Sequence, residues 1–393
     1  MKEREEKTFN AFDTKASVLK RIKYGVIVLL VLVLLFFLVG YREDITVENI
    51  RYLLKYVNVS PAKIGSADAQ SVVFDEGVPS QLGVFRSDLV VVTKNQVSIY
   101  DLSAKKGFSD SVSLATPMLS LGDKYFAVYD QGDNYFALYN SFSKIYEQTT
   151  PFAIWDIILG NNGDFCVITS DKGYRSVLKI YNSDFENKMN WYITDRYMVC
   201  ADIFSDKDTY YVSGCVENNE NGNFVSQVSV LREDTETPSM TASFNGEMIL
   251  DTEFFENGNI CTLTDTALRV LDLSGKTLST VNFDSDGLRF FEAGEKYSVL
   301  VLNENSIGTK HRVIIVDERG NTSMDVFVDS DIKDVSVEED NIILLGTQVL
   351  TAINPDEKKI NSHPTDKSYN EAYALTNSRA VVFCNNTAYI VGV

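Results

Sequence analysis

The motif LRVLDLS at residues 268–274 decides the fold, because variants of it recur along the chain. Each copy joins a short run of β-branched and aromatic residues to an Asp, Asn or Ser turn, which is typical of a strand that ends in a tight turn. The other copies read VSIYDLS (97–103), FALYNSF (136–142), LKIYNSD (178–184), VSVLRED (228–234), VIIVDER (313–319), LTAINPD (350–356) and AYIVGV (388–393). Eight copies at a near-regular interval indicate a repeat architecture.

The spacing of the copies identifies the repeating unit. Between equivalent positions from Tyr100 to Ile390, successive copies lie 39, 42, 50, 40, 45, 37 and 37 residues apart. A four-stranded propeller blade takes roughly 40–50 residues. A second strand precedes each copy, for example ICTLT (260–264) and AVVFC (380–384). The sequence therefore predicts an all-β fold, a single closed β-propeller of eight four-stranded blades over residues 66–393.

The eighth copy ends after its third strand, so the outer strand of that blade has to come from elsewhere. The segment AQSVVF (69–74) is strand-like and precedes the first copy. We expect it to close the ring, since closure removes the open strand edges that invite aggregation. Tandem β-sandwiches are the alternative architecture. They would need linkers between modules, whereas the chain has only 7 Pro and no Pro/Gly/Ser-rich stretch.

The N-terminal part follows a different pattern. Residues 24–41, YGVIVLLVLVLLFFLVGY, carry no charge and no Pro, and this length suffices for one membrane-spanning helix. Residues 1–23 carry a net charge of +3, whereas residues 42–393 carry −22. The positive-inside bias then predicts a cytoplasmic tail, a span in the plasma membrane and an extracytoplasmic domain. A cleaved signal peptide fits less well, because its apolar region would be shorter and followed by a small-x-small site.

Residues 42–65 are predicted to form a juxtamembrane stalk. Within ITVENIRYLLKYVN (45–58), Ile50, Leu53, Leu54 and Val57 share one face at helical spacing. The expected role is packing on the domain or on the bilayer surface. A dimerising coiled coil is the less favoured alternative, because two turns are too short for a heptad pattern.

This order of segments resembles a known but uncharacterised family. A signal anchor, an ENIRYLLKYVN-type stalk (48–58) and a weak repeat are similar to single-pass, signal-anchored proteins of Gram-positive anaerobes with a propeller-like ectodomain. The resemblance implies no activity. The ectodomain also resembles quinoprotein-like, outer-membrane-assembly and WD40-like propellers in texture. It has only Trp155 and Trp191, so neither quinone binding nor a true WD40 repeat is implied.

Residues that could carry chemistry are few. The two histidines are His311, in an expected strand, and His363, in an expected turn, which are too few for a Ser-His-Asp triad or a histidine-rich metal site. The run 282–287 resembles the start of an EF-hand loop, but Ala293 stands where the bidentate Glu would be. At most a weak calcium-binding turn is left. No catalytic residue, no metal site and no cofactor is predicted.

The five cysteines lie in apolar, strand-like runs, and an odd number leaves at least one unpaired. Cys200 and Cys215 could face each other across a hairpin. Two free thiols are favoured over a disulfide, because buried single cysteines usually behave as small hydrophobes.

The net charge of the domain excludes some classes of binding partner. A net −22 beyond the span argues against nucleic acid and against docking on anionic lipid. The predicted function is therefore a membrane-anchored binding or scaffold module in the cell envelope. Its partners would be the bilayer, through residues 24–41, and a protein or another envelope component. The alternatives are a carbohydrate-active hydrolase with carboxylates at the channel mouth and a single-pass sensor, which the short tail disfavours.

The candidate binding residues come from connections between second and third strands. Three of these, 171–175, 217–223 and 303–309, look long or rich in polar residues. Long loops on a short-loop scaffold are commonly functional. Strand direction places them on the same face as the blade-to-blade connections. The predicted binding surface consists of Tyr174, Arg175, Asn219, Asn221 and Asn305.

Overall fold

The computed structural model describes residues 62–63, 70–74, 79–86, 88–101, 105–206, 208–218, 224–233, 235, 237–304, 310–375 and 378–393. Residues Pro61–Val393 form one compact unit. The predicted tail (1–23), span (24–41) and helical stalk segment (45–58) lie outside the described residues. In the described part, no helix has the length and apolar character needed to cross a membrane.

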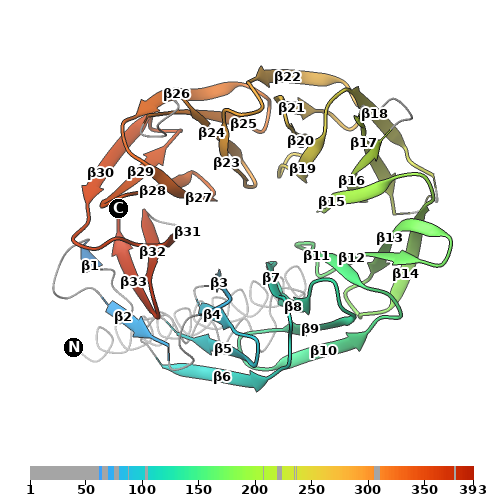
Figure 1. The fold of residues 1–393 in the computed structure, drawn as a ribbon, viewed down its shortest axis with the longest axis horizontal. Helices are drawn as coiled ribbons and strands as arrows, with labels where there is room; N and C mark the ends of the chain where they lie inside the picture. The colour runs from blue at the N-terminus through green and yellow to red at the C-terminus, as the bar shows by residue number, and fades with distance from the viewer. Residues whose placement is uncertain are drawn as a thin grey trace, which may run out of the picture. The chain divides into compact units, whose positions relative to one another are not determined.

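Eight sheets are arranged as the blades of a ring (Figure 1), and we call the region that their first strands face the channel. The first strand of each blade is innermost: β3 (Gln81–Phe85), β7 (Pro117–Leu121), β11 (Ile154–Leu159), β15 (Tyr197–Ser205), β19 (Ile249–Phe254), β23 (Leu288–Ala293), β27 (Ile332–Glu338) and β31 (Glu371–Leu375). The second strands are β4 (Asp88–Val92), β8 (Phe126–Asp130), β12 (Phe165–Asp171), β16 (Thr209–Asn218), β20 (Ile260–Thr264), β24 (Tyr297–Asn303), β28 (Asn341–Gly346) and β32 (Arg379–Cys384).

The third strands coincide with the eight copies of the sequence motif: β5 (Gln96–Tyr100), β9 (Tyr135–Tyr139), β13 (Tyr174–Tyr181), β17 (Phe224–Arg232), β21 (Ala267–Leu271), β25 (His311–Asp317), β29 (Val349–Asn354) and β33 (Thr387–Gly392). The outer strands are β6 (Lys106–Ser111), β10 (Lys144–Thr149), β14 (Asn187–Ile193), β18 (Met240–Asn245), β22 (Thr277–Asn282), β26 (Thr322–Val328), β30 (Lys359–Pro364) and, in the eighth blade, β2 (Gln70–Val73). The predicted eight-bladed propeller is confirmed.

Burial explains why the middle strands read as near-continuous apolar runs. Strands β4, β8 and β20 are buried at every position, because neighbouring blades cover both faces of each sheet. The outer strand β6 alternates half-buried and exposed residues, since only one of its faces packs on a neighbour. The core is therefore a set of apolar layers between successive blades.

A repeated β-bulge links one blade to the next. In blades 3 to 7 the register between first and second strands shifts near the start of the first strand, for example between Ile154 and Asp156. The backbone N–H before the bulge then reaches the preceding blade. Ile249 N donates to Ser226 Oγ (2.8 Å), and Ile332 N donates to the buried His311 Nε2 (3.4 Å). His311 is thus a structural residue of the blade interface.

The structure also shows where His363, the five cysteines and the calcium-like run 282–287 lie. His363 was expected in a turn, but it lies in the outer strand β30, because residues 359–364 pair with β29. All five cysteines are free thiols, including Cys200 and Cys215. Residues 283–287 form the connection from β22 to β23, where Gly287 N donates to Asp284 O (2.8 Å).

The N-terminal strand closes the ring. β2 pairs antiparallel with β33, with Val72 opposite Ala388, and the two-residue β1 (Ala62–Lys63) runs parallel to the end of β33. Phe74 is 1% exposed, and its ring lies 5.5 Å from that of Tyr100 in blade 1 and 6.2 Å from that of Phe383 in blade 8. One side chain therefore packs across the seam between the first and last blades.

This contact gives the first prediction. Phe74→Ala should lower the free energy of unfolding by about 3–5 kcal/mol, because it removes a buried aromatic ring and leaves a cavity. Val73→Ala, in the same strand but 56% exposed, is the matched control and should change stability by less than about 0.5 kcal/mol. Urea unfolding of both variants measures the difference. Equal losses in the two variants would mean that the seam does not depend on this packing.

Candidate functional site

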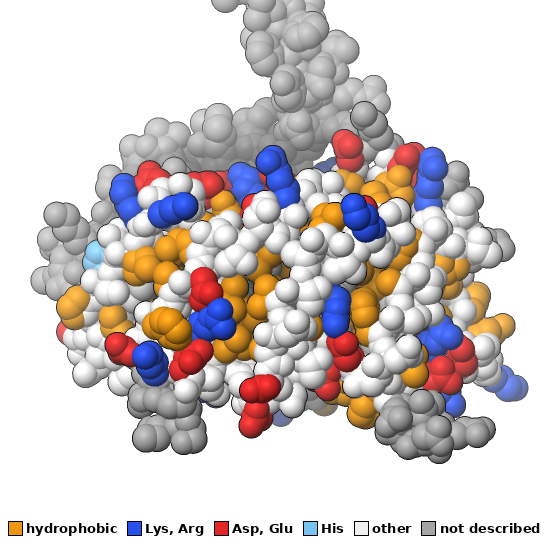
Figure 2. Space-filling model, turned by 90° about the horizontal axis from the view of Figure 1, so that it is seen from above, with side chains coloured by type: hydrophobic (Ala, Val, Ile, Leu, Met, Phe, Trp, Pro, Cys, Tyr) orange, Lys and Arg blue, Asp and Glu red, His pale blue; other side chains and the backbone are white. Residues whose placement is uncertain are grey.

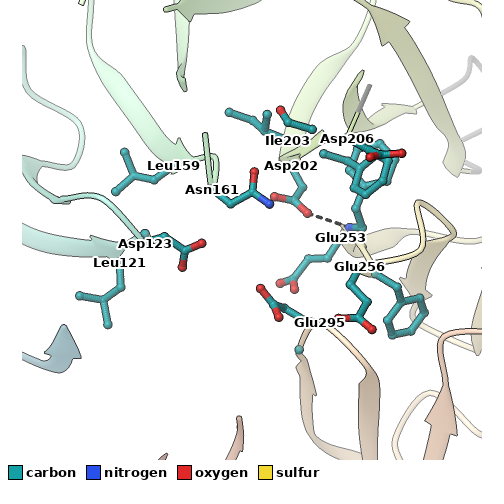
Figure 3. A pocket seen from close by; sticks show the side chains of 16 residues that line it. Leu121, Asp123, Leu159, Asn161, Asp202, Ile203, Asp206, Glu253, Glu256 and Glu295 are labelled. Carbon is teal, nitrogen blue, oxygen red and sulfur yellow. Dashed lines mark hydrogen bonds between the residues drawn. The ribbon is translucent and has the colours of Figure 1, made fainter. Parts of the chain in front are cut away.

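A cavity of about 380 Å³ opens at one mouth of the channel (Figure 3). This mouth lies on the turn face, the face that carries the connections from first to second strands, such as residues 122–124 in blade 2. The lining includes no Lys or Arg. The charged side chains that line the cavity come from blades 2, 4, 5 and 6 and are all acidic: Asp123, Asp202, Asp206, Glu253, Glu256 and Glu295.

The carboxylates come from two kinds of position in the repeat. Side chains alternate along a strand, and the first strands repeatedly carry acids, as in LDTEF (250–254) and KDVSVE (333–338). The turns that follow the first strands of blades 2, 5 and 6 add further acids, Asp123, Glu256 and Glu295. Figure 3 shows the carboxylates of Asp123, Glu253 and Glu295 pointing into one opening. The mouth is therefore acidic because the same positions are acidic in successive blades.

Some of these acids also hold the blades together. The Asp202 carboxylate accepts a hydrogen bond from Phe254 N of the next blade (2.7 Å), which is the dashed line in Figure 3. Asp334 accepts from Ala372 N in the same way (2.8 Å). Glu253 differs from them, since no described residue donates a hydrogen bond or an ion pair to its carboxylate. Its carboxylate is therefore available for a ligand.

The protein environment raises the pKa values of the channel acids. Burial raises the pKa of Asp202 to about 7 and that of Asp251 to about 6, against the opposing hydrogen bonds from backbone N–H groups. Burial, reinforced by the charges of Asp251, Asp202 and Glu292, raises the pKa of Glu253 well above its usual range. Water in the channel reaches Glu292, yet the surrounding walls raise its pKa to about 7. Near neutral pH the channel thus holds a mixture of protonated and ionised acids.

This arrangement favours a positively charged ligand over a bare metal ion. A cation in the cavity would supply the missing countercharge and would be held by several carboxylates. Across the described residues, no group of three His, Cys, Asp or Glu side chains is positioned to hold a metal ion. The volume of about 380 Å³ falls in the range of small-molecule sites. An organic cation or a basic side chain fits these properties best.

Two of the predicted binding residues, Tyr174 and Arg175, lie on the opposite face, the loop face, which carries the second-to-third-strand and blade-to-blade connections. Tyr174 and Arg175 begin β13. Their connection is not long, because Asp171 pairs with Tyr174 across the two-residue turn 172–173, in which Gly173 has a φ of +89°. Asn219, Asn221 and Asn305 lie outside the described residues. The structure therefore brings Tyr174 and Arg175 together and does not bring either of them to the acidic mouth.

The sequence suggested carboxylates at the channel mouth only in the alternative hydrolase hypothesis, and it did not identify which acids form the mouth. The signal was present as Asp or Glu at alternate positions of consecutive first strands. On the outer side of the ring formed by β22 and β26, acidic, basic and apolar side chains are interspersed (Figure 2). A lining of one charge sign is thus a property of the channel mouth and not of that outer surface.

The second cavity, about 500 Å³, includes part of the weak calcium-like motif. Asn282, Asp284 and Gly287 line it together with Arg312. Arg312 is paired with Asp325 (Nη2–Oδ2 2.7 Å), and no group of metal-binding side chains is found in the described residues here either. The motif is accounted for by the turn between blades 5 and 6.

Comparisons with known proteins give a family profile that covers most of the chain. A sequence profile described as "Family of unknown function (DUF5711)" matches residues 69–390. No curated protein matches the chain significantly. Hsv2 from Kluyvelomyces marxianus has a TM-score of 0.48 at 10% identity, over 74% of this chain and 98% of that one. The Cps50 (Swd1) β-propeller domain from Myceliophteria thermophila has a TM-score of 0.49 at 9% identity, over 85% and 100%.

The raised pKa values give the second prediction. An acid whose pKa is higher in the folded than in the unfolded chain binds an extra proton on folding, so the free energy of unfolding falls as pH rises between the two values. We expect stability to fall between about pH 4 and pH 7, by roughly 1.4 kcal/mol per unit of pKa shift for each such acid. Acids with lowered pKa values, such as Asp325 beside Arg312, titrate below this range.

Asp202→Asn should flatten this pH dependence, because the amide oxygen still accepts from Phe254 N but cannot ionise. Asp184→Asn, on an exposed turn of the same face, is the control and should keep the wild-type slope. Urea unfolding at each pH provides the measurement. Parallel pH profiles for wild type and Asp202→Asn would show that Asp202 does not titrate in this range.

Proposed function

Because the chain belongs to DUF5711, a family of unknown function, its activity has to be argued from its own site, and we propose that it is a membrane-anchored binding module for positively charged ligands. The observation that carries this proposal is the cavity at the turn face, which is lined by six carboxylates and no basic side chain. The ligand class is an organic cation or a basic side chain of a larger molecule.

The energetics of the site support binding. Like-charged acids held close together in a low-dielectric wall raise each other's free energy when ionised. A cationic ligand removes that repulsion and lowers the pKa values of Asp202 and Glu253, so binding releases protons. Affinity should therefore rise with pH across the range in which these acids ionise.

The location in the proposal rests on the N-terminal sequence. An uncharged 18-residue segment (24–41) follows a tail of net charge +3, which favours a span with the tail in the cytoplasm. The propeller, and with it the acidic mouth, would then be extracytoplasmic, in the cell envelope.

A carbohydrate-active hydrolase is the second candidate, favoured by one observation. Burial raises the pKa of Glu253 well above its usual range, and this carboxyl group shares the cavity with that of Glu295. Glycoside hydrolysis uses two carboxyl groups, of which one, the general acid, has a raised pKa. A ligand that binds in this cavity and is not hydrolysed would support the binding module, whereas hydrolysis of a bound carbohydrate would support the enzyme.

Titration calorimetry of the full-length chain with spermidine tests the ligand class. Binding should be saturable and should strengthen as pH rises. Glu253→Gln with Glu295→Gln should weaken it roughly tenfold or more, since two carboxylates of the cavity are lost. Asp184→Asn with Glu186→Gln, two exposed acids on the same face but away from the cavity, should bind like wild type. If both double variants bound spermidine equally weakly, the loss would reflect the net charge of the protein and would contradict binding in this cavity.

The proposed topology makes the fourth prediction. Protease added outside intact cells or spheroplasts should digest the 42–393 domain and leave the 1–23 tail protected, because the Lys15–Lys23 cluster favours the cytoplasmic side. Epitope tags at the two ends report the result on a blot. Digestion of the N-terminal tag alone would reverse the orientation.

A further inference from the structure

Large exposed apolar side chains gather at one part of the loop face. The described residues contain twelve such side chains, and seven of them lie at the loop-face ends of strands in blades 3 to 5. We call these seven the apolar crescent: Trp155, Tyr174, Tyr192, Tyr197, Val199, Phe224 and Leu250. The five others lie one each in blades 2, 5, 6, 7 and 8. The concentration in three consecutive blades marks an interaction surface, because single exposed apolar residues are usually scattered.

The repeated bulge puts three members of the crescent at the channel mouth. Trp155, Val199 and Leu250 each occupy the bulge position of a first strand, in blades 3, 4 and 5, and are 50%, 48% and 37% exposed. The same position holds Arg289 in blade 6 and Lys333 in blade 7. At the mouth on the loop face, the bulge residues are thus apolar in blades 3 to 5 and basic in blades 6 and 7.

The two bulge cations have no acidic partner among the described residues. Arg289 lies over the Phe290 ring, with its Cζ 4.9 Å from the ring centre. Lys333 Nζ donates to the Ser368 hydroxyl (2.8 Å). In a chain of net charge −19, two basic groups without carboxylate partners beside an apolar surface are available for an acidic partner.

The aromatic part of the crescent is held in place by local contacts. The rings of Tyr174 and Tyr192 lie 4.5 Å apart, on adjacent strands of blade 3. Arg175 donates to Asp195 O (2.8 Å), and its Cζ lies 5.2 Å from the Tyr197 ring centre. The crescent is therefore preorganised, which lowers the entropic cost of binding. Tyr, Trp and Arg are also the residues that most often dominate the energy of protein interfaces.

We infer that the crescent and the two bulge cations form a docking surface for a polypeptide segment that combines apolar and acidic side chains. The apolar side chains of the segment would cover Trp155, Val199 and Leu250, and its carboxylates would pair with Arg289 and Lys333. A glycan fits less well, because Val199 and Leu250 offer no ring for sugar stacking. This surface is independent of the acidic cavity, which opens on the opposite face.

The occupant is tested by selection from a library of random short peptides displayed on phage, against the full-length chain. Wild type should enrich peptides that combine Asp or Glu with Leu, Phe or Trp. Arg289→Glu with Lys333→Glu should reverse the charge preference and enrich Lys or Arg with the same apolar residues. Recovery of peptides without a charge preference from both proteins would overturn the inference.

Synthetic copies of the selected peptides then test the apolar half by fluorescence anisotropy. Val199→Ser with Leu250→Ser should weaken binding roughly tenfold or more. Leu278→Ser with Ile360→Ser, exposed to a similar degree on outer strands, should leave affinity unchanged and controls for loss of surface apolarity. Equal affinity for both pairs of variants would place the peptides elsewhere.

A second copy of this chain is the alternative occupant of the crescent. Sedimentation at increasing protein concentration should show no association that depends on Val199 and Leu250. If wild type associates and Val199→Ser with Leu250→Ser abolishes the association, the crescent is an interface between copies of this chain, and the inference is wrong. Loss of spermidine binding in the Glu253→Gln variant would not affect either result, since that site is separate.

Discussion

The pairing of β2 with β33 is the constraint on which the rest of the propeller depends. It joins residues near position 72 to residues near position 388, so the outer edge of the last blade is covered by the start of the domain. Without it, residues 387–390 of β33 would form an open edge. Once the ring is closed, every first strand has to face the central channel, and whatever its exposed positions carry is gathered at the two mouths.

The composition of the two mouths reflects a balance between stability and function. Burying carboxylates without countercharges costs free energy, and the raised pKa values of Asp202, Asp251 and Glu253 report that cost. The packing between blades offsets it, with large side chains such as Tyr139, Tyr211 and Phe165 fully buried. A fold with such a large apolar core tolerates unfavourable charge at its centre, and sites that are unfavourable for the free protein are often those that a ligand completes.

Much of the fold followed from the sequence, because the third strands carry a strong local signal. Apolar alternation followed by an Asp or Asn turn, as in LKIYNSD (178–184), is visible without knowledge of any partner strand. The closing strand was predictable for a different reason, since the last copy was one strand short. The particular acids of the mouth were not identified, because Asp202 and Glu253 lie 51 residues apart in the chain and meet only when the blades are placed side by side. The loop at 171–175 looked long because Tyr174 and Arg175 were counted as loop, whereas register places them in β13.

The bulge in the first strands of blades 3 to 7 separates two tasks that usually constrain each other. The residue before the bulge forms a hydrogen bond to the preceding blade, and the residue after it pairs with the second strand again. The bulged residue itself has no partner in the strand register. Trp, Val, Leu, Arg and Lys occupy this position in successive blades, which shows how freely it accepts different chemistry. The bulge positions at the loop-face mouth can therefore differ in side chain while the backbone of the blades stays the same. Divergence or engineering could rewrite its recognition properties one blade at a time without refolding the propeller.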